Sequence, residues 1–151
     1  MVTTYKIADD IKEVAQKLIK DIDKLNHISI NNIVFVRINS HIKGDHILGR
    51  TVCLSDRAQF LTNKKYIIEF PPVYDTLKKE QQEVVVEHEL MHIPNDEKGL
   101  IPHDIGEFRE IIRKYGLDWI TVISDVEKKV KLLKEKEKIE KKQQKLNRSG
   151  D

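Results

Sequence analysis

The sequence predicts an α+β fold: an N-terminal helix, a small mixed or antiparallel sheet of three or slightly more strands, a helix containing His-Glu-x-x-His, and C-terminal helices. Three observations support this prediction. Apolar residues recur at helical spacing in residues 9–25 and 123–133. Three short segments are rich in β-branched residues and are bounded by turn residues. The chain has 151 residues, 39% of them hydrophobic, which suffices for one core but not for two.

The first predicted helix spans residues 9–25. Its apolar side chains recur at steps of three and four, with charged residues between them, and they are Ile11, Val14, Ala15, Leu18, Ile19 and Ile22. Asp9 or Asp10 can cap the start of this helix.

Three strands are predicted after the first helix, in residues 33–38, 47–54 and 65–70. Residues 40–46 contain a Gly-Asp pair and are expected to form a turn or loop between the first two strands. The pair Pro71-Pro72 ends the third strand, because proline cannot donate to the hydrogen-bond ladder of a sheet.

The remaining elements are expected to be helical. Asp75 or Thr76 caps a helix that runs to about Ile93, where Pro94 prevents its continuation. Residues 105–115 form the next helix, and Asp118 caps the last one. The apolar stripe of the last helix ends near Leu133, so this helix should dock up to that point and then fray or project.

The charge distribution separates a body, residues 1–125, from a basic helical extension, residues 126–151. The extension has ten basic and five acidic residues, whereas the body has a formal charge of −3 within a total of +2. One interpretation is contact with nucleic acid or an acidic partner. The other is a solvated helix, which is favoured because Glu135, Glu137 and Glu140 lie among the lysines.

Composition also indicates a cytoplasmic location. No run approaches 18 apolar residues, so no membrane span is expected. The first ten residues have no apolar core of a signal peptide, and the single Cys53 cannot form an internal disulfide. Nothing in the composition fixes the oligomeric state.

The chemistry is concentrated in the sequence His-Glu-Leu-Met-His. On a helix, His88 and His92 lie on one face and can present two imidazoles to one ion, while Glu89 is rotated by about 100° and can reach a water bound there. Neutral imidazoles suit zinc, and a site with three protein ligands and a water is catalytic rather than structural. The pattern therefore predicts one catalytic Zn²⁺ ion.

The third ligand is predicted to be His103. A glycine and a histidine three and six residues after His92 would form another zinc pattern, but these positions hold Asn95 and Lys98. The segment between His92 and His103 contains glycine and proline residues that let the chain double back. A glutamate far along the chain is the other known third ligand. Asp104 and Glu107 stay open as alternatives.

The run VVVEHELMHIPNDEKGLIPHDIGEF, residues 84–108, resembles a family of small metallopeptidases found in archaea and phages. That family has a His-Glu-Leu-x-His-Ile-Pro signature, followed by a His-Asp pair and an aromatic residue. The matching residues here are His88, Glu89, Leu90, His92, Ile93, Pro94, His103, Asp104 and Phe108. The resemblance covers roughly residues 30–115. It implies a zincin-like fold, zinc binding and peptidase activity on a peptide or protein substrate.

These observations suggest that Glu89 is the general base of peptide hydrolysis. From the resemblance, the strand at residues 66–70 is expected to pair with an extended substrate along a free edge. The alternative is a regulatory or DNA-associated module that keeps the zincin scaffold and uses its basic tail for recognition. A purely structural zinc site would have no need of a carboxylate at position 89.

Overall fold

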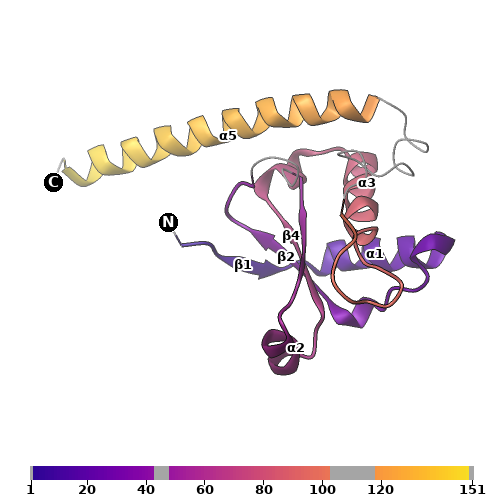
Figure 1. Cartoon of the computed structure of the whole chain (residues 1–151). Helices are drawn as coiled ribbons and strands as arrows, with labels where there is room; N and C mark the ends of the chain where they lie inside the picture. Colours follow the sequence, from indigo (N-terminus) through magenta and orange to yellow (C-terminus); the bar gives the residue numbers. More distant parts are fainter. Residues whose placement is uncertain (1, 43–47, 103–117, 150–151) are drawn as a thin grey trace. The chain divides into compact units, whose positions relative to one another are not determined.

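The computed structural model describes residues 2–42, 48–102 and 118–149, and a mixed four-stranded sheet organises the first part of the chain (Figure 1). The strands are β1 (Tyr5–Ile7), β2 (Ile33–Ile38), β3 (Arg50–Cys53) and β4 (Tyr66–Phe70), in the order β1-β2-β4-β3. β2 and β4 run parallel, and β1 and β3 are antiparallel to their neighbours. The predicted α+β class and small mixed sheet are thus confirmed, with β1 as a strand that the sequence did not predict.

The central strands β2 and β4 agree with the predicted segments to within one residue, and both consist mostly of buried apolar residues. Strand β4 pairs with β2 on one side and with β3 on the other. Its backbone donors and acceptors are therefore used within the sheet. The expectation that residues 66–70 offer a free edge to a substrate is wrong, and among the described residues β1 and β3 are the edge strands.

Two helices, α1 (Asp9–Asp21) and α3 (Lys79–Leu90), pack against each other and against the same face of the sheet. Helix α1 buries Ile11 and Ala15, as its predicted stripe requires. It is not capped by an aspartate. Its N-cap is Ala8, and the carboxylate of Asp10 accepts two hydrogen bonds from Arg37 at 2.6 and 2.7 Å, which lower the pKa of Asp10.

The motif helix α3 begins later than predicted. Residues Pro72–Thr76 form a 3₁₀ helix, in which the Thr76 hydroxyl donates to the Val73 carbonyl and so does not cap α3. Leu77 and Lys78 are extended, and α3 starts at Lys79. The chain needs these extended residues to turn from the end of β4 into the helix.

A short helix, α2 (Asp56–Thr62), connects β3 to β4 and was not predicted. The hydroxyl of Ser55 caps it by accepting a hydrogen bond from the Ala58 N–H at 3.2 Å. The predicted strand at 47–54 is correspondingly shorter, as β3 ends at Cys53. The predicted loop at 40–46 falls largely outside the described residues, and the predicted helix at 105–115 does so entirely.

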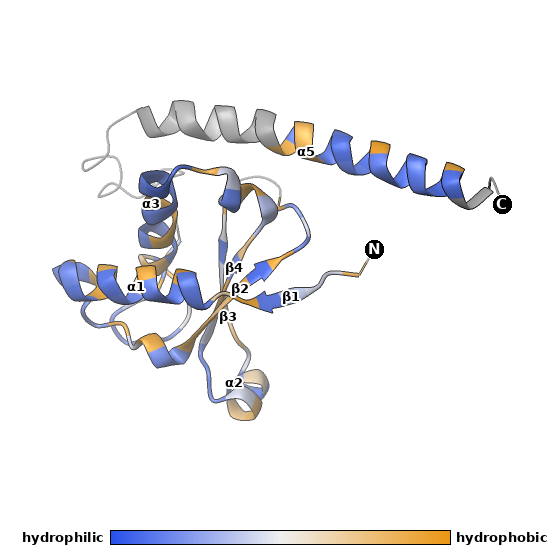
Figure 2. Ribbon diagram, turned by 180° about the vertical axis from the view of Figure 1, so that it is seen from behind, coloured by the Kyte–Doolittle hydropathy of each residue, from blue (hydrophilic) through white to orange (hydrophobic). Residues whose placement is uncertain are grey.

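The chain divides into two compact units, Met1–Gly116 and Leu117–Asp151. Helix α5 (Asp118–Ser149) belongs to the second unit and has 32 residues, so the helix does not fray after Leu133. In its last part, hydrophilic residues dominate, and isolated apolar side chains at Leu132, Ile139 and Leu146 are exposed (Figure 2). No helix in the described parts of the chain is long and apolar enough to span a membrane.

Candidate metal centre

The His-Glu-Leu-Met-His sequence lies at the C-terminal end of α3, where the helix is buried on all sides. Every residue from Val84 to Leu90 is buried. The α-helix ends at Leu90, and the His92 N–H donates to the Glu89 carbonyl at 3.2 Å, so the last turn is tightened to a 3₁₀ form. The rings of His92 and His88 lie edge to face, with centroids 5.2 Å apart and planes at 76°.

The three polar residues of the motif lie close together. One ligand atom from each of His88, Glu89 and His92 lies within 4.8 Å of the other two. Their side chains are buried, with exposed fractions of 8%, 3% and 6%. Two imidazoles and a carboxylate brought this close in a buried place form a donor set that could hold a metal ion.

The ring of His92 is held in one orientation by the chain that follows it. Its Nδ1 atom lies 2.6 Å from the carbonyl oxygen of Ile101. Because a carbonyl oxygen only accepts, Nδ1 carries the hydrogen, and in the neutral ring Nε2 then carries the lone pair that a metal requires. The Ile101 N–H also donates to the His92 carbonyl at 2.7 Å.

The carboxylate of Glu89 is positioned by strand β3. The Thr51 hydroxyl lies 2.7 Å from Glu89 Oε2 and 3.0 Å from the Glu89 carbonyl oxygen, so it can donate to either. Gly49 lies beneath the same side chain, and a Cβ there would come within 3.4 Å of Glu89 Cγ and 3.5 Å of Oε1. These are ordinary van der Waals distances, so the backbone at residue 49 packs directly against the Glu89 side chain.

None of these supporting contacts was predicted from the sequence. Thr51 is 38 residues from Glu89, and the Ile101 contact uses a backbone carbonyl, which every residue has. The one available signal was Gly49, because a glycine at the start of a strand often marks a close approach of another group.

The predicted third ligand, His103, lies outside the described residues, as do its alternatives Asp104 and Glu107. The structure therefore brings together His88, Glu89 and His92, and the assignment of His103 stays a prediction.

A comparison with known protein families gives a match to the family described as putative phage metallopeptidase, over residues 3–134. No curated protein and no solved structure matches the chain. The family match includes all described residues of the metal centre and most of the chain. The family resemblance found in residues 84–108 is confirmed, and the chain belongs to the putative phage metallopeptidase family.

Proposed function

We propose that the protein is a zinc-dependent peptidase, in which His88 and His92 bind one Zn²⁺ ion and Glu89 is the general base. The observation that carries this proposal is the convergence of the three buried side chains within 4.8 Å. The family match supports the same class of activity. Two imidazoles and a carboxylate are a donor set that a zinc ion fits.

The residues present fit a zinc ion in their chemistry. The Ile101 carbonyl fixes the hydrogen of His92 on Nδ1 and so makes Nε2 the ligand atom. When bound, zinc would supply Lewis-acid activation of a water molecule and of the substrate carbonyl. Imidazoles also accept iron, manganese or nickel, so metal analysis must accompany the assay.

Glu89 would move the proton during hydrolysis. Its carboxylate takes a proton from the attacking water and later gives it to the leaving amine. The Thr51 hydroxyl, 2.7 Å from Oε2, holds the plane of the carboxylate and leaves further acceptor positions on both oxygens. Proton transfer depends on this orientation, because the base must be within hydrogen-bond reach of the water.

We assign His103 as the third ligand, and the reach of the chain supports this assignment. Ile101 is hydrogen-bonded to His92 through both its N–H and its carbonyl. Two residues of chain span at most about 7 Å. This length of chain permits an imidazole at position 103 to share an ion with His92.

The substrate is proposed to bind as an extended peptide along β3. In the described part of the chain, β3 pairs with β4 alone and lies at the edge of the sheet. Its residue Thr51 contacts Glu89, so this edge runs next to the general base. A peptide added to the edge would form backbone hydrogen bonds and bring a peptide bond near the metal centre.

The test is metal analysis and peptide hydrolysis with the full chain. We expect about one zinc ion per chain in the wild type, loss of tight zinc binding in His88→Ala and His92→Ala, and weaker binding in His103→Ala. The control is His41→Ala, which removes an imidazole outside the motif and should retain zinc. Retention of stoichiometric zinc by both His88→Ala and His92→Ala, or failure of the zinc-loaded wild type to cleave any peptide in a mixed library, would contradict the proposal.

A further inference from the structure

We propose that Glu97 is a positioning residue for the metal centre. It holds the loop after α3, residues 93–102, in the conformation in which Ile101 fixes the ring of His92. This inference rests on the proposed function, because it assigns to Glu97 an effect on metal binding at that site.

The loop leaves the end of α3 and returns to it. The Ile101 N–H donates to the His92 carbonyl at 2.7 Å, and His92 Nδ1 donates to the Ile101 carbonyl at 2.6 Å. The residue that orients the imidazole is thus nine positions further along the chain. The orientation of His92 therefore depends on what holds the whole loop in place.

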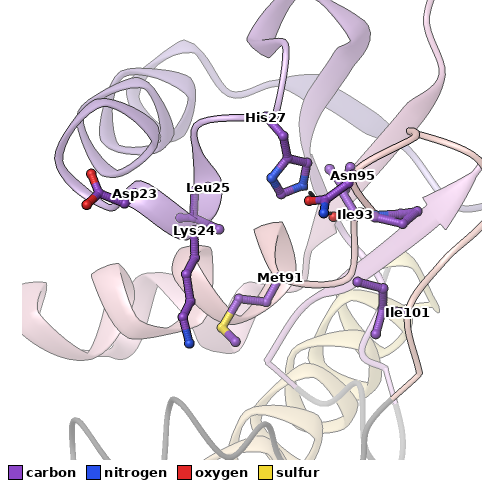
Figure 3. Close-up of a pocket in the computed structure, with 9 residues that line it drawn as sticks. Asp23, Lys24, Leu25, His27, Met91, Ile93, Asn95 and Ile101 are labelled. Atoms are coloured by element: carbon purple, nitrogen blue, oxygen red, sulfur yellow. Dashed lines mark hydrogen bonds between the residues drawn. The ribbon is translucent and has the colours of Figure 1, made fainter.

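A pocket of about 760 Å³ lies beside the loop, so the packing around the loop is incomplete on that side. Figure 3 shows Met91, Ile93 and Ile101 around this pocket, opposite the 3₁₀ helix η1 (Asp23–Leu25). Side chains that face a pocket lack van der Waals partners on that side. A polar contact on this side of the loop comes from His27, whose Nε2 donates to the Ile93 carbonyl at 2.8 Å.

Glu97 connects the far part of the loop to the rest of the fold. Its Oε1 accepts from the Ser29 N–H at 2.9 Å, and its Oε2 accepts from Asn32 Nδ2 at 2.8 Å and Lys65 Nζ at 3.2 Å. The side chain is 12% exposed. Burial raises the pKa of Glu97, but these hydrogen bonds and the Lys65 charge lower it by more, so the carboxylate stays ionised at neutral pH.

The backbone at Glu97 is in the left-handed region, with φ of 51°. This conformation is unfavourable for a residue that has a Cβ, and it persists where surrounding contacts determine it. A second anchor lies two residues on, where the Tyr66 hydroxyl donates to the Gly99 carbonyl at 2.8 Å. Burial raises the pKa of Tyr66 to about 12, so this donor stays protonated.

The experiment measures zinc affinity of the full chain by competition with a chromophoric chelator. Glu97→Ala removes the carboxylate. Glu97→Gly removes it and also relieves the backbone strain. We expect both variants to bind zinc about 10-fold to 100-fold more weakly than the wild type, as for loss of other groups that orient metal ligands. The visible spectrum of the Co²⁺-loaded protein should change as well, because the coordination geometry changes.

The matched control is Asp96→Ala, whose exposed carboxylate accepts a local hydrogen bond from the Lys98 N–H at 3.0 Å and no other from the described residues. It should keep zinc affinity within about twofold, because it removes no contact to the metal-orienting end of the loop. If Glu97→Ala fails to fold, Asn32→Ala removes a single donor from Glu97, and an affinity loss of about threefold or more is expected of that variant.

Wild-type zinc affinity and an unchanged Co²⁺ spectrum in Glu97→Ala would overturn the inference, even if urea unfolding of the metal-free protein showed reduced stability. Wild-type zinc affinity in Glu97→Gly, together with reduced affinity in Glu97→Ala, would also overturn the inference. The backbone conformation, and not the carboxylate, would then determine the zinc affinity. A wild-type chain that binds no zinc would overturn the proposed function, which the Glu97 variants do not address.

Discussion

The two faces of strand β3 bury two glutamates with different partners. On one face, Arg50 donates to Glu69 Oε1 at 3.2 Å, and on the other, Thr51 donates to Glu89. The exposed fractions of the two glutamates are 5% and 3%, so burial does not distinguish them. Glu69 has a cation supplied by the chain itself. Glu89 has a neutral hydroxyl donor and two neighbouring imidazoles, an environment suited to a positive charge that comes from a bound metal.

The partner of a buried carboxylate is therefore more informative about function than its burial. A carboxylate that is paired with an arginine is neutralised by the fold and has a structural role. A carboxylate held by a hydroxyl next to potential metal ligands is oriented beside a possible site for a cation. The predictions below test this distinction by changing each glutamate and each partner separately.

The largest effect is expected from Glu89→Gln. Removal of a general base lowers hydrolysis by about 100-fold to 10,000-fold, whereas zinc should stay bound because both imidazoles are intact. Rates on a peptide mixture and zinc content are measured on the same preparation. Glu69→Gln is the matched control on the other face of β3 and should keep the rate within about threefold. If both variants lose activity equally, the two faces do not differ in function.

The next effect concerns stability. Arg50→Ala leaves the Glu69 carboxylate buried without its cation, and the free energy of unfolding should fall by about 1–2 kcal/mol. This loss is at the lower end of the usual range for removing one partner of a buried charge pair. The reason is that the Arg50 side chain is 41% exposed, so water partly screens the pair. Urea denaturation of the metal-free protein gives the value. The double variant Arg50→Ala/Glu69→Gln should recover part of the lost free energy of unfolding. Equal losses in the Arg50→Ala single variant and the double variant would argue against a charge pair between the two residues.

Thr51→Val tests the other face with a residue of nearly the same shape. The hydroxyl donates to a buried carboxylate, so its loss should reduce the free energy of unfolding by about 1 kcal/mol and the rate of hydrolysis by about 5-fold to 10-fold. Thr51→Ser keeps the hydroxyl and should recover most of the rate. Hydrolysis at the wild-type rate in Thr51→Val would contradict the assignment of an orienting role to Thr51.

The parts of the fold that could be predicted are those determined by local sequence. β2 and β4 are runs of apolar residues, and α1 has a regular apolar stripe, so neighbouring residues alone identify them. β1 has three residues that are all exposed, and it is a strand because it pairs with β2. Helix α2 has no buried residue and depends on its Ser55 cap, so periodicity gives no signal for it.

The same distinction, between what local sequence determines and what packing of distant segments determines, applies to the candidate site. His88, Glu89 and His92 were predicted because a helix fixes which of its own residues share a side. Thr51 and Ile101 were not predicted, since their contacts depend on how separate segments pack. Glu69, which is paired with Arg50, and Glu89 are both glutamates, so residue type alone does not distinguish them. The sequence motif identifies Glu89, and the structure supplies the physical difference between the two glutamates.

The smallest effect is expected from removal of the tail, residues 135–151. The charges of the tail are exposed, whereas the two glutamates beside β3 are buried. The family match ends at residue 134, and the following apolar residues Ile139 and Leu146 are exposed by 59% and 69%. Truncation after Lys134 should change the free energy of unfolding by less than about 0.5 kcal/mol, because it removes solvated residues that bury little surface. Zinc affinity should be unchanged.

Binding of duplex DNA at low and moderate salt is measured on the same two proteins. Interleaved glutamates weaken the attraction of the lysines for phosphates, so we expect no difference between the full and the truncated chain. Salt-dependent binding that is lost on truncation would instead support a nucleic-acid role for the tail. In that case the exposed charges of the tail would bind DNA. The comparison of Glu69 with Glu89, in which the partner of a carboxylate indicates its function, would then apply only to buried charges.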